Sequence, residues 1–255
     1  MSKATGLIKR AIPSNVRPTL RLARNTLRSL RYRGEGRYCP VCKTKSRCFG
    51  AYGVDSRADA QCMRCGAVER HRLTWLFFER RTNLLDGHPK DVLHVAPEPQ
   101  FEKLLKPAIG PSYITADLFD PSAMVRMDVT NIEYPDNTFD VVYCSHVLEH
   151  VDDDLKAMSE FLRVLKPSGW AVLSVPISAA KTFEDPSVTD PAERLRLFGQ
   201  EDHVRRYGPD YIDRLKSVGF KVTVINPEDF LEAAEISEMA VGPNRGEQIF
   251  FCTKS

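Results

Sequence analysis

Short apolar segments alternate with helical segments through the second half of this chain, and this alternation constrains its fold more than any other feature. Seven segments are typical of buried strands: 91–96, 113–116, 124–127, 139–144, 170–175, 221–225 and 248–252. Helical patterns cover 101–106, 154–165 and 210–218, and a polar insertion runs over 176–208. This order predicts an α/β fold, with a Rossmann-like, doubly wound and mostly parallel seven-stranded sheet between two layers of helices.

Two pairs of cysteines precede this region. Cys39 and Cys42 form one C-x2-C pair, and Cys62 and Cys65 form the second after a spacer of 19 residues. Residues 38–66 hold too few apolar side chains for a core of their own. The spacing predicts a small N-terminal zinc knuckle with four thiolate ligands, in which the metal is structural because no coordination position stays open. A helix over 67–85 then connects the knuckle to the sheet.

The first 37 residues carry ten Lys or Arg and one acidic residue, whereas residues 38–255 contain more acid than base. From Thr19 onward, apolar residues recur at helical spacing among arginines. Residues 1–37 are therefore interpreted as a basic amphipathic arm that binds an anionic membrane surface, or as a solvated arm that packs on the body. Nucleic acid is the weaker interpretation, because no aromatic platform accompanies the arginines.

Hydrophobic residues make up 42% of the chain and charged residues 27%, as in ordinary globular proteins. No apolar run approaches the ~20 residues that cross a bilayer. We expect a cytoplasmic protein, which the arm could hold at the inner membrane surface.

Acidic residues follow two neighbouring strands of the predicted sheet. In doubly wound sheets, ligands bind beyond the carboxyl ends of the strands. Asp117 follows the second strand at the place where a carboxylate usually binds the ribose hydroxyls of a nucleoside. Asp128 follows the third strand, where it could accept a hydrogen bond from an adenine amino group. The two acids together predict an adenosine site, to which Leu118, beside Asp117, is also assigned.

The run over 127–176, with its elements TFDVVYCSHVLEHV and RVLKPSG, resembles the central half of class I S-adenosylmethionine-dependent methyltransferases. The resemblance extends over roughly 91–251 and implies a methyltransferase domain at 67–255. It implies that Asp117 binds the ribose and that Asp128 with Val129 binds the adenine. The exit of the fourth strand, with Cys144 and His146, would contact the methionine portion of the cofactor.

The turn after the first strand departs from this family. It reads VAPEPQ, with two prolines and none of the usual glycines, and His94 stands where the family commonly has an acid. The VLHVAPE sequence with a preceding cysteine knuckle resembles a bacterial subgroup of these enzymes. Ala96 and Glu98 would then line a substituted cofactor loop, and Glu98 would pair with the ammonium group. The alternative is a degenerate loop that no longer binds.

Candidate catalytic residues lie in the polar insertion. His203 has a suitable pKa range for removing a proton near neutral pH, and Asp202 is adjacent to it. Arg205, Arg206 and Tyr207 could bind a phosphate, a carboxylate or sugar hydroxyls. The alternative is a loop that is ordered by its own polar contacts.

His146, Glu149 and His150 follow the fourth strand. At helical spacing they could share a face and bind a divalent metal ion, as an E-x2-E-H cluster does in a few methyltransferases. The commoner role is to line the cofactor and acceptor pocket.

The sequence therefore predicts a methyltransferase that modifies an oxygen or nitrogen of a small-molecule or glycan-type acceptor. One alternative is a non-catalytic binding protein with a degenerate cofactor loop. Another is an RNA or protein methyltransferase that uses the knuckle for recognition, although the tetrapeptide typical of base methylation is missing after the fourth strand.

Overall fold

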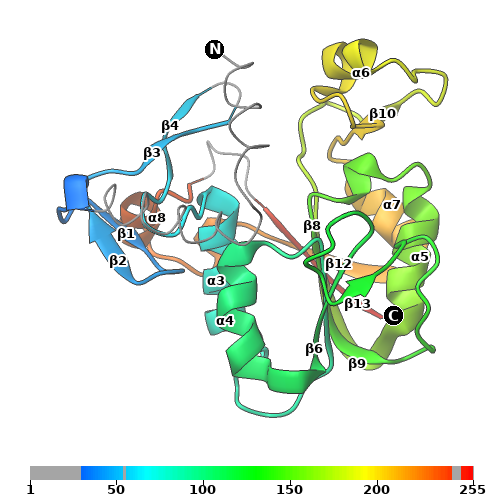
Figure 1. Ribbon diagram of the computed structural model, residues 1–255, viewed down its shortest axis with the longest axis horizontal. Helices are drawn as coiled ribbons and strands as arrows, with labels where there is room; N and C mark the ends of the chain where they lie inside the picture. Colours follow the sequence, from blue (N-terminus) through cyan, green and yellow to red (C-terminus); the bar gives the residue numbers. More distant parts are fainter. Residues whose placement is uncertain (1–29, 54–55, 243–247, 255) are drawn as a thin grey trace.

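The computed structural model describes residues 30–53, 56–242 and 248–254 (Figure 1). Most of the basic arm predicted at residues 1–37 thus lies outside the described residues, as does the helix expected from Thr19 onward. None of the helices within the described part of the chain is both long and apolar enough to cross a membrane.

A seven-stranded sheet forms the centre of the fold, as predicted. Its strands are β5 (Val92–Val95), β6 (Tyr113–Asp117), β7 (Val125–Arg126), β8 (Phe139–Ser145), β9 (Leu165–Ser174), β12 (Phe220–Ile225) and β13 (Ile249–Lys254). The order across the sheet is β12-β13-β9-β8-β5-β6-β7. Strand β13 is antiparallel to both of its neighbours, and the pairs among β5 to β9 are all parallel.

Helices cover both faces of this sheet (Figure 1). On one face lie α3 (Glu69–Arg81), α4 (Pro99–Ile109) and α8 (Ala233–Met239), and on the other lie α5 (Asp154–Val164) and α7 (Tyr211–Ser217). Strand β8 shows why two layers form: Val141 and Tyr143 join the core beneath α3 and α4, whereas Val142 and Cys144 join the core beneath α5. Because side chains alternate along a strand, an apolar strand needs cover on both sides.

Strand β9 begins earlier than the sequence indicates. The sequence predicts a helix over 154–165 and a strand from residue 170, but α5 ends at Val164 and the chain is extended from Leu165 onward. The Lys166 ammonium lies 2.8 Å from carboxylate oxygens of both Asp91 and Asp140. A Cβ on Gly169 would come within 2.8 Å of the Asp140 carbonyl oxygen, so only glycine lets these backbones approach.

The N-terminal knuckle consists of two short hairpins, β1 (Arg37–Cys39) with β2 (Thr44–Ser46) and β3 (Gly50–Tyr52) with β4 (Arg57–Gln61). Its apolar side chains belong to the same core as α3 and α8. The buried Arg72 of α3 donates hydrogen bonds to the carbonyl oxygens of Ala60, Ala67, Met239 and Ala240. The knuckle is thus packed on the body of the protein.

The insertion over 176–208 forms a β10–β11 hairpin (Phe183–Glu184 and Arg205–Arg206) and helix α6 (Pro191–Phe198). Buried polar groups attach it to α5 and α7. The Tyr207 hydroxyl donates to Asp154 over 2.6 Å, and Asp154 also forms an ion pair with Arg214. These contacts place the insertion beside the exit of β8.

Candidate functional site

Asp117 and Asp128 lie at neighbouring strand ends, as expected. The Met127 amide donates to the Asp117 carbonyl oxygen over 3.1 Å, which holds the two exits together. One carboxylate oxygen of Asp117 accepts from the amides of Phe119 and Asp120, both at 2.7 Å. For Asp117, Oδ2 has no hydrogen-bond partner within the described residues. Its carboxylate therefore shapes the following loop with one oxygen and offers the other to a ligand.

Asp128 is exposed, and its Oδ1 accepts from the amide and the hydroxyl of Thr130, both at 2.8 Å. Of the other residues assigned to the adenosine site, Leu118 is half-buried and Val129 is buried. Cys144 is buried in the core beneath α5, so only its backbone can contribute at the exit of β8.

The turn after β5 has a backbone conformation that usually requires glycine. Ala96 has a φ of 48°, in the left-handed region, although it carries a Cβ. Pro99 occupies the first turn of α4, where the missing N–H costs nothing. His146, at the exit of the adjacent β8, is also left-handed, with a φ of 57°. Two sharp turns therefore lie side by side at the edge where the cofactor was expected.

The carboxylate of Glu98 already has partners within the protein. It lies 3.0 Å from His94 Nε2 and accepts from the Tyr143 hydroxyl at 3.3 Å. His71 Nε2 lies 3.6 Å away. The predicted pairing of Glu98 with a cofactor ammonium group would have to compete with these contacts, and it stays a prediction.

The δ nitrogens of the two histidines are held by hydrogen bonds on the side away from Glu98. Because His71 Nδ1 accepts from the Val68 amide, its proton is on Nε2, toward Glu98. His94 is fully buried, with Nδ1 2.6 Å from the Tyr113 hydroxyl. Burial alone would raise the pKa of Glu98, but hydrogen bonds and charge from His71 and His94 outweigh it and hold that pKa well below its usual range. His94 is thus part of the support beneath the turn.

A polar cavity of about 200 Å³ opens at the carboxyl ends of β8 and β9. It lies between α3, the exits of these strands and the start of β13. Its lining residues are Arg57, Arg70, Leu73, Thr74, Ser145, His146, Ser174, Val175, Pro176, Ile177, Gln248 and Phe250. This edge is where doubly wound sheets bind their ligands.

His146 is the one residue of the predicted site that lines this cavity. Its Nδ1 lies 3.2 Å from Oε1 of Glu149, and the Glu149 side chain is only 2% exposed. Arg70 from α3 also reaches the cavity, and its Nε is buried with no hydrogen-bond partner among the residues that the structure describes. The arrangement combines a histidine oriented by a carboxylate with a cation that can meet a negatively charged group.

His203 and Asp202 do not form the pair suggested by their adjacency. Asp202 is largely exposed and its carboxylate lies 3.3 Å from His150 Nδ1. His203 is buried, donates from Nδ1 to the Phe198 carbonyl oxygen at 3.2 Å and packs edge-on against His150. Burial and then the nearby His150 lower the pKa of His203. His203 is not among the residues that line the cavity.

The adjacent residues of the insertion are occupied by structural contacts. Arg205 is buried and forms an ion pair with Glu184, while donating to backbone carbonyl oxygens beside η2 (Leu148–His150). Tyr207 is fully buried. Arg206 donates to the hydroxyl and carbonyl oxygens of Ser178. The interpretation of these residues as anion or sugar ligands is wrong for Arg205 and Tyr207, because neither side chain reaches solvent.

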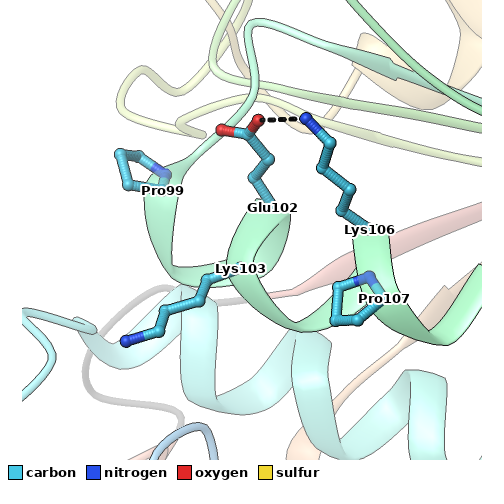
Figure 2. Close-up of a pocket in the computed structure, with 5 residues that line it drawn as sticks. All are labelled: Pro99, Glu102, Lys103, Lys106 and Pro107. Carbon is cyan, nitrogen blue, oxygen red and sulfur yellow. Dashed lines mark ion pairs between the residues drawn. The ribbon is translucent and has the colours of Figure 1, made fainter. Parts of the chain in front are cut away.

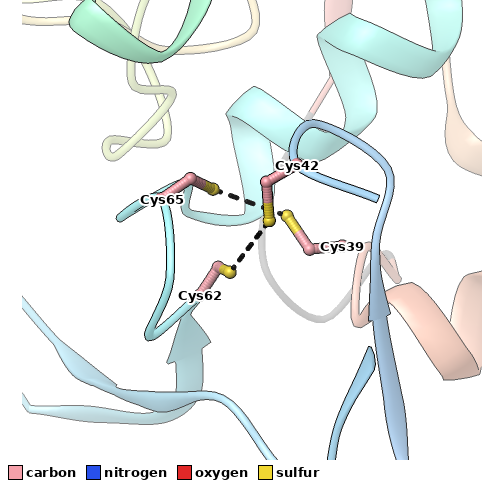
Figure 3. A group of neighbouring side chains, drawn as sticks. All are labelled: Cys39, Cys42, Cys62 and Cys65. Atoms are coloured by element: carbon pink, nitrogen blue, oxygen red, sulfur yellow. Dashed lines mark hydrogen bonds between the residues drawn. The ribbon is translucent and has the colours of Figure 1, made fainter. Parts of the chain in front are cut away.

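The four cysteines of the knuckle converge (Figure 3). Cys39 Sγ lies 3.7 Å from Cys65 Sγ, and Cys42 Sγ lies 3.7 Å from Cys62 Sγ. A tetrahedral zinc ion about 2.3 Å from each sulfur separates the sulfurs by roughly 3.8 Å, whereas a disulfide joins them at about 2.05 Å. The backbone amide of Ala67 also donates to Cys65 Sγ. The donor set and its spacing fit a structural zinc site.

A second, larger hollow of about 430 Å³ lies along α4 (Figure 2). It is lined by Pro99, Glu102, Lys103, Lys106 and Pro107, and the Glu102 and Lys106 side chains are 4.0 Å apart across it. None of the residues predicted for cofactor binding or catalysis lines it. We assign it no role.

Sequence reasoning missed two features of the site. Arg70 was overlooked because α3 precedes the sheet and looked like a connection. An arginine in the first turn of a mostly buried helix was the available signal. Phe119, which is 86% exposed next to Asp117, was also missed. A large apolar side chain in a polar loop after an acid could have drawn attention to it.

Residues 81–173, from the end of α3 into β9, match the family model described as "Methyltransferase domain" (Methyltransf_11). The match contains the five parallel strands with Asp117, Asp128 and His146. For this part of the chain, the match supports the resemblance to class I S-adenosylmethionine-dependent methyltransferases that the sequence motifs indicate.

Shorter stretches are similar to curated proteins. The chain is 34% identical over 98 residues to phosphoethanolamine N-methyltransferase 3 of Arabidopsis thaliana, which covers 38% of this chain and 18% of that protein. It is 41% identical over 58 residues to the ubiquinone/menaquinone biosynthesis C-methyltransferase UbiE of Idiomarina loihiensis, covering 22% of this chain and 23% of the relative. The matches thus span less than a quarter of these relatives, whose names give different acceptor atoms.

Solved structures resemble the fold at a distance. A methyltransferase from Mesorhizobium loti shares 14% identity with a TM-score of 0.48, covering 71% of this chain and 97% of that chain. The 1,6-didemethyltoxoflavin-N1-methyltransferase of Burkholderia thailandensis, solved with S-adenosylhomocysteine, shares 13% identity with a TM-score of 0.47. In that case 73% of this chain and 78% of the other are covered.

Proposed function

We propose that the protein is an S-adenosylmethionine-dependent methyltransferase acting on an oxygen or nitrogen of a small-molecule or glycan-type acceptor. The polar cavity at the exits of β8 and β9 carries this proposal, because it adjoins the strand ends at which the family binds its methyl donor. When bound, S-adenosylmethionine supplies an electrophilic methyl carbon. The protein then has to bind the donor, align the acceptor and remove a proton.

The donor would lie over the exits of β5, β6 and β7. Asp117 Oδ2 is available for the ribose hydroxyls, and the exposed Asp128 is available for the adenine amino group. The left-handed conformation of Ala96 supports cofactor binding. The backbone turns there as it would at a glycine, and alanine has the smallest side chain that includes a Cβ. This favours a substituted cofactor loop over a degenerate one.

His146 is positioned to take the proton that a hydroxyl acceptor must lose. Its Nδ1 faces the buried Glu149 carboxylate, which leaves Nε2 as the basic nitrogen. The prediction that His203 is the base has not been tested, and we prefer His146 because it lines the cavity. Arg70 would meet a carboxylate or phosphate there.

The knuckle has a structural role in this proposal. We infer that zinc at the four cysteines stabilises a small unit that packs on α3, the helix that brings Arg70 to the cavity. The assignment of residues 1–37 to a membrane surface stays a prediction.

Calorimetric titration with S-adenosylmethionine and S-adenosylhomocysteine tests the proposal. We expect both to bind, and Asp117→Asn to weaken binding about tenfold, because the amide cannot accept from the ribose at the second position. The amide oxygen still accepts from the Phe119 and Asp120 amides, so the loop is preserved. Asp120→Asn is the matched control.

Absence of binding by either compound at high micromolar concentration would remove the enzymatic interpretation. If they bind, transfer of a labelled methyl group from the donor to components of a cell extract identifies the acceptor class.

A further inference from the structure

A second group of side chains, which could bind a metal ion, lies behind His146. The proposed methyl transfer does not use this group. Glu149 and His150 come from η2, and His203 comes from the insertion after β10. One donor atom from each residue lies within 4.8 Å of the others. The sequence suggested His146 as the third member, but the structure places His203 there, and His146 is paired with the other oxygen of Glu149.

The hydrogen bonds around both histidines leave their ε nitrogens as lone-pair donors. His203 Nδ1 lies against the Phe198 carbonyl oxygen, which can only accept, so the proton of the neutral ring is on Nδ1. His150 Nδ1 faces both the carboxylate and the carbonyl oxygen of Asp202, at 3.3 Å each. Oxygen atoms behind the δ nitrogens are the arrangement that orients histidines in metal sites.

Two of the three residues are buried, and each has a side-chain atom without a hydrogen-bond partner within the described residues. Glu149 is 2% exposed and its Oε2 makes no hydrogen bond; His203 is 6% exposed and its Nε2 makes none. A buried carboxylate oxygen without a partner is costly, and a lone pair beside it on an imidazole makes the site more electron-rich. Both features favour the binding of a cation at this group.

We propose that Glu149, His150 and His203 bind a divalent first-row transition-metal ion. Two imidazole nitrogens with one carboxylate oxygen suit Mn²⁺, Co²⁺, Fe²⁺ or Zn²⁺ better than Mg²⁺ or Ca²⁺, which prefer oxygen ligands. Metal–ligand distances of about 2.1 Å require the donor atoms to move slightly closer. His150 is 34% exposed, so coordination positions stay open toward solvent.

The role of this ion rests on the proposed function. It would lie across the Glu149 carboxylate from His146, which lines the acceptor cavity. There it could bind an oxygen of the acceptor and lower the cost of deprotonation.

The test is Mn²⁺ binding to the full-length protein after a single equivalent of zinc per chain has been added, which the four soft thiolates bind before the Glu149, His150 and His203 group. Electron paramagnetic resonance measures free Mn²⁺ directly, and Mn²⁺ discriminates the two sites because it disfavours thiolates. We expect one Mn²⁺ per chain, with affinity at least about tenfold weaker in His150→Gln and in His203→Gln. His88→Gln, at an exposed histidine, should bind as the wild type does.

The His150 variant keeps the test valid if the buried His203 variant fails to fold. Absence of Mn²⁺ binding below about 1 mM, or equal binding by the wild type and His150→Gln, would overturn the proposal. S-adenosylhomocysteine affinity is measured separately on the same samples. Mn²⁺ binding without cofactor binding would support the metal site and reject the proposed methyltransferase function.

Discussion

Glu98 shows how one residue can serve the fold at a site where sequence suggested a ligand. Its carboxylate is held by His94, Tyr143 and His71 beneath the turn after β5. The low pKa of Glu98 means that these contacts favour the ionised form, and hence the folded state at neutral pH. Stability and site geometry are therefore linked through this side chain.

We expect Glu98→Gln to remove part of the acid sensitivity of the protein. A carboxyl group with a depressed folded-state pKa contributes stability above its unfolded pKa, near the usual 4.5, and loses it as the pH falls further. The free energy of unfolding of the wild type should therefore decrease below about pH 4.5 by more than that of the variant, with a difference above about 1 kcal/mol. Urea unfolding across this pH range measures it.

Glu102→Gln, in the helix that begins directly after Glu98 and beside the hollow in Figure 2, provides the control. It should keep the acid dependence of the wild type. Identical pH profiles for the wild type and Glu98→Gln would show that His71 and His94 do not stabilise the carboxylate.

The sequence predicted the positions of single residues along the chain better than it predicted their contacts. Asp117 is the last residue of β6 and Asp128 follows β7, close to the predicted strand ends, because strand ends are encoded locally by apolar runs. The partner of His203 could not be predicted, since it depends on where a long insertion returns to the sheet: the Val204 amide donates to the Glu149 carbonyl oxygen over 2.9 Å. Sequence adjacency suggested Asp202 instead.

At the scale of elements, the knuckle is the part that sequence spacing described most completely. Each C-x2-C turn brings two thiols together locally, and the hairpins bring the two turns to each other. The 3.7 Å separations join sulfurs of different turns, so the site closes the knuckle.

Cys62→Ser should lose the bound zinc and destabilise the protein. Removing one thiolate weakens a site whose binding energy is coupled to folding, so we expect the Tm to fall by about 5 °C or more. Elemental analysis and thermal melts with and without a chelator measure both effects. Cys48→Ser, which changes a cysteine outside the cluster, should keep zinc and Tm. A wild type that purifies without zinc and is insensitive to the chelator would contradict the assignment.

Element boundaries show the limits of local patterns. Helix α4 begins two residues before and ends three residues after the predicted 101–106, which is ordinary uncertainty. The early start of β9 is different in kind. The Lys-Pro-Ser-Gly sequence is typical of a turn, but pairing of Leu165 with Phe139 and the ion pairs of Lys166 extend the strand. Tertiary contacts decided that segment.

At the scale of the molecule, Arg72 joins segments that are far apart in sequence. Its guanidinium connects the knuckle at Ala60, the start of α3 and the end of α8 at Met239, and it stacks 4.1 Å over the Phe49 ring. Four carbonyl oxygens depend on this one side chain. We therefore regard the knuckle and the sheet as one cooperative unit.

We expect Arg72→Met to lower the free energy of unfolding by about 3 kcal/mol or more, because several buried carbonyl oxygens lose their donor. The knuckle and body should then unfold in separate steps, visible as two transitions in calorimetry. Arg81→Met, at the exposed end of the same helix, should have little effect. A single transition with unchanged stability in Arg72→Met would show that the knuckle is not coupled through this residue.

The sequence by itself determined the seven strands, the metal-binding spacing of the cysteines and the acids at the strand ends, because each depends on periodicity or spacing within a few residues. Only the tertiary structure decided which helix supplies Arg70 to the cavity and that Glu98 points inward. It also decided that His203 joins Glu149 and His150. These outcomes depend on packing between segments that are far apart in the sequence. Local sequence patterns do not predict which of these distant segments will be in contact.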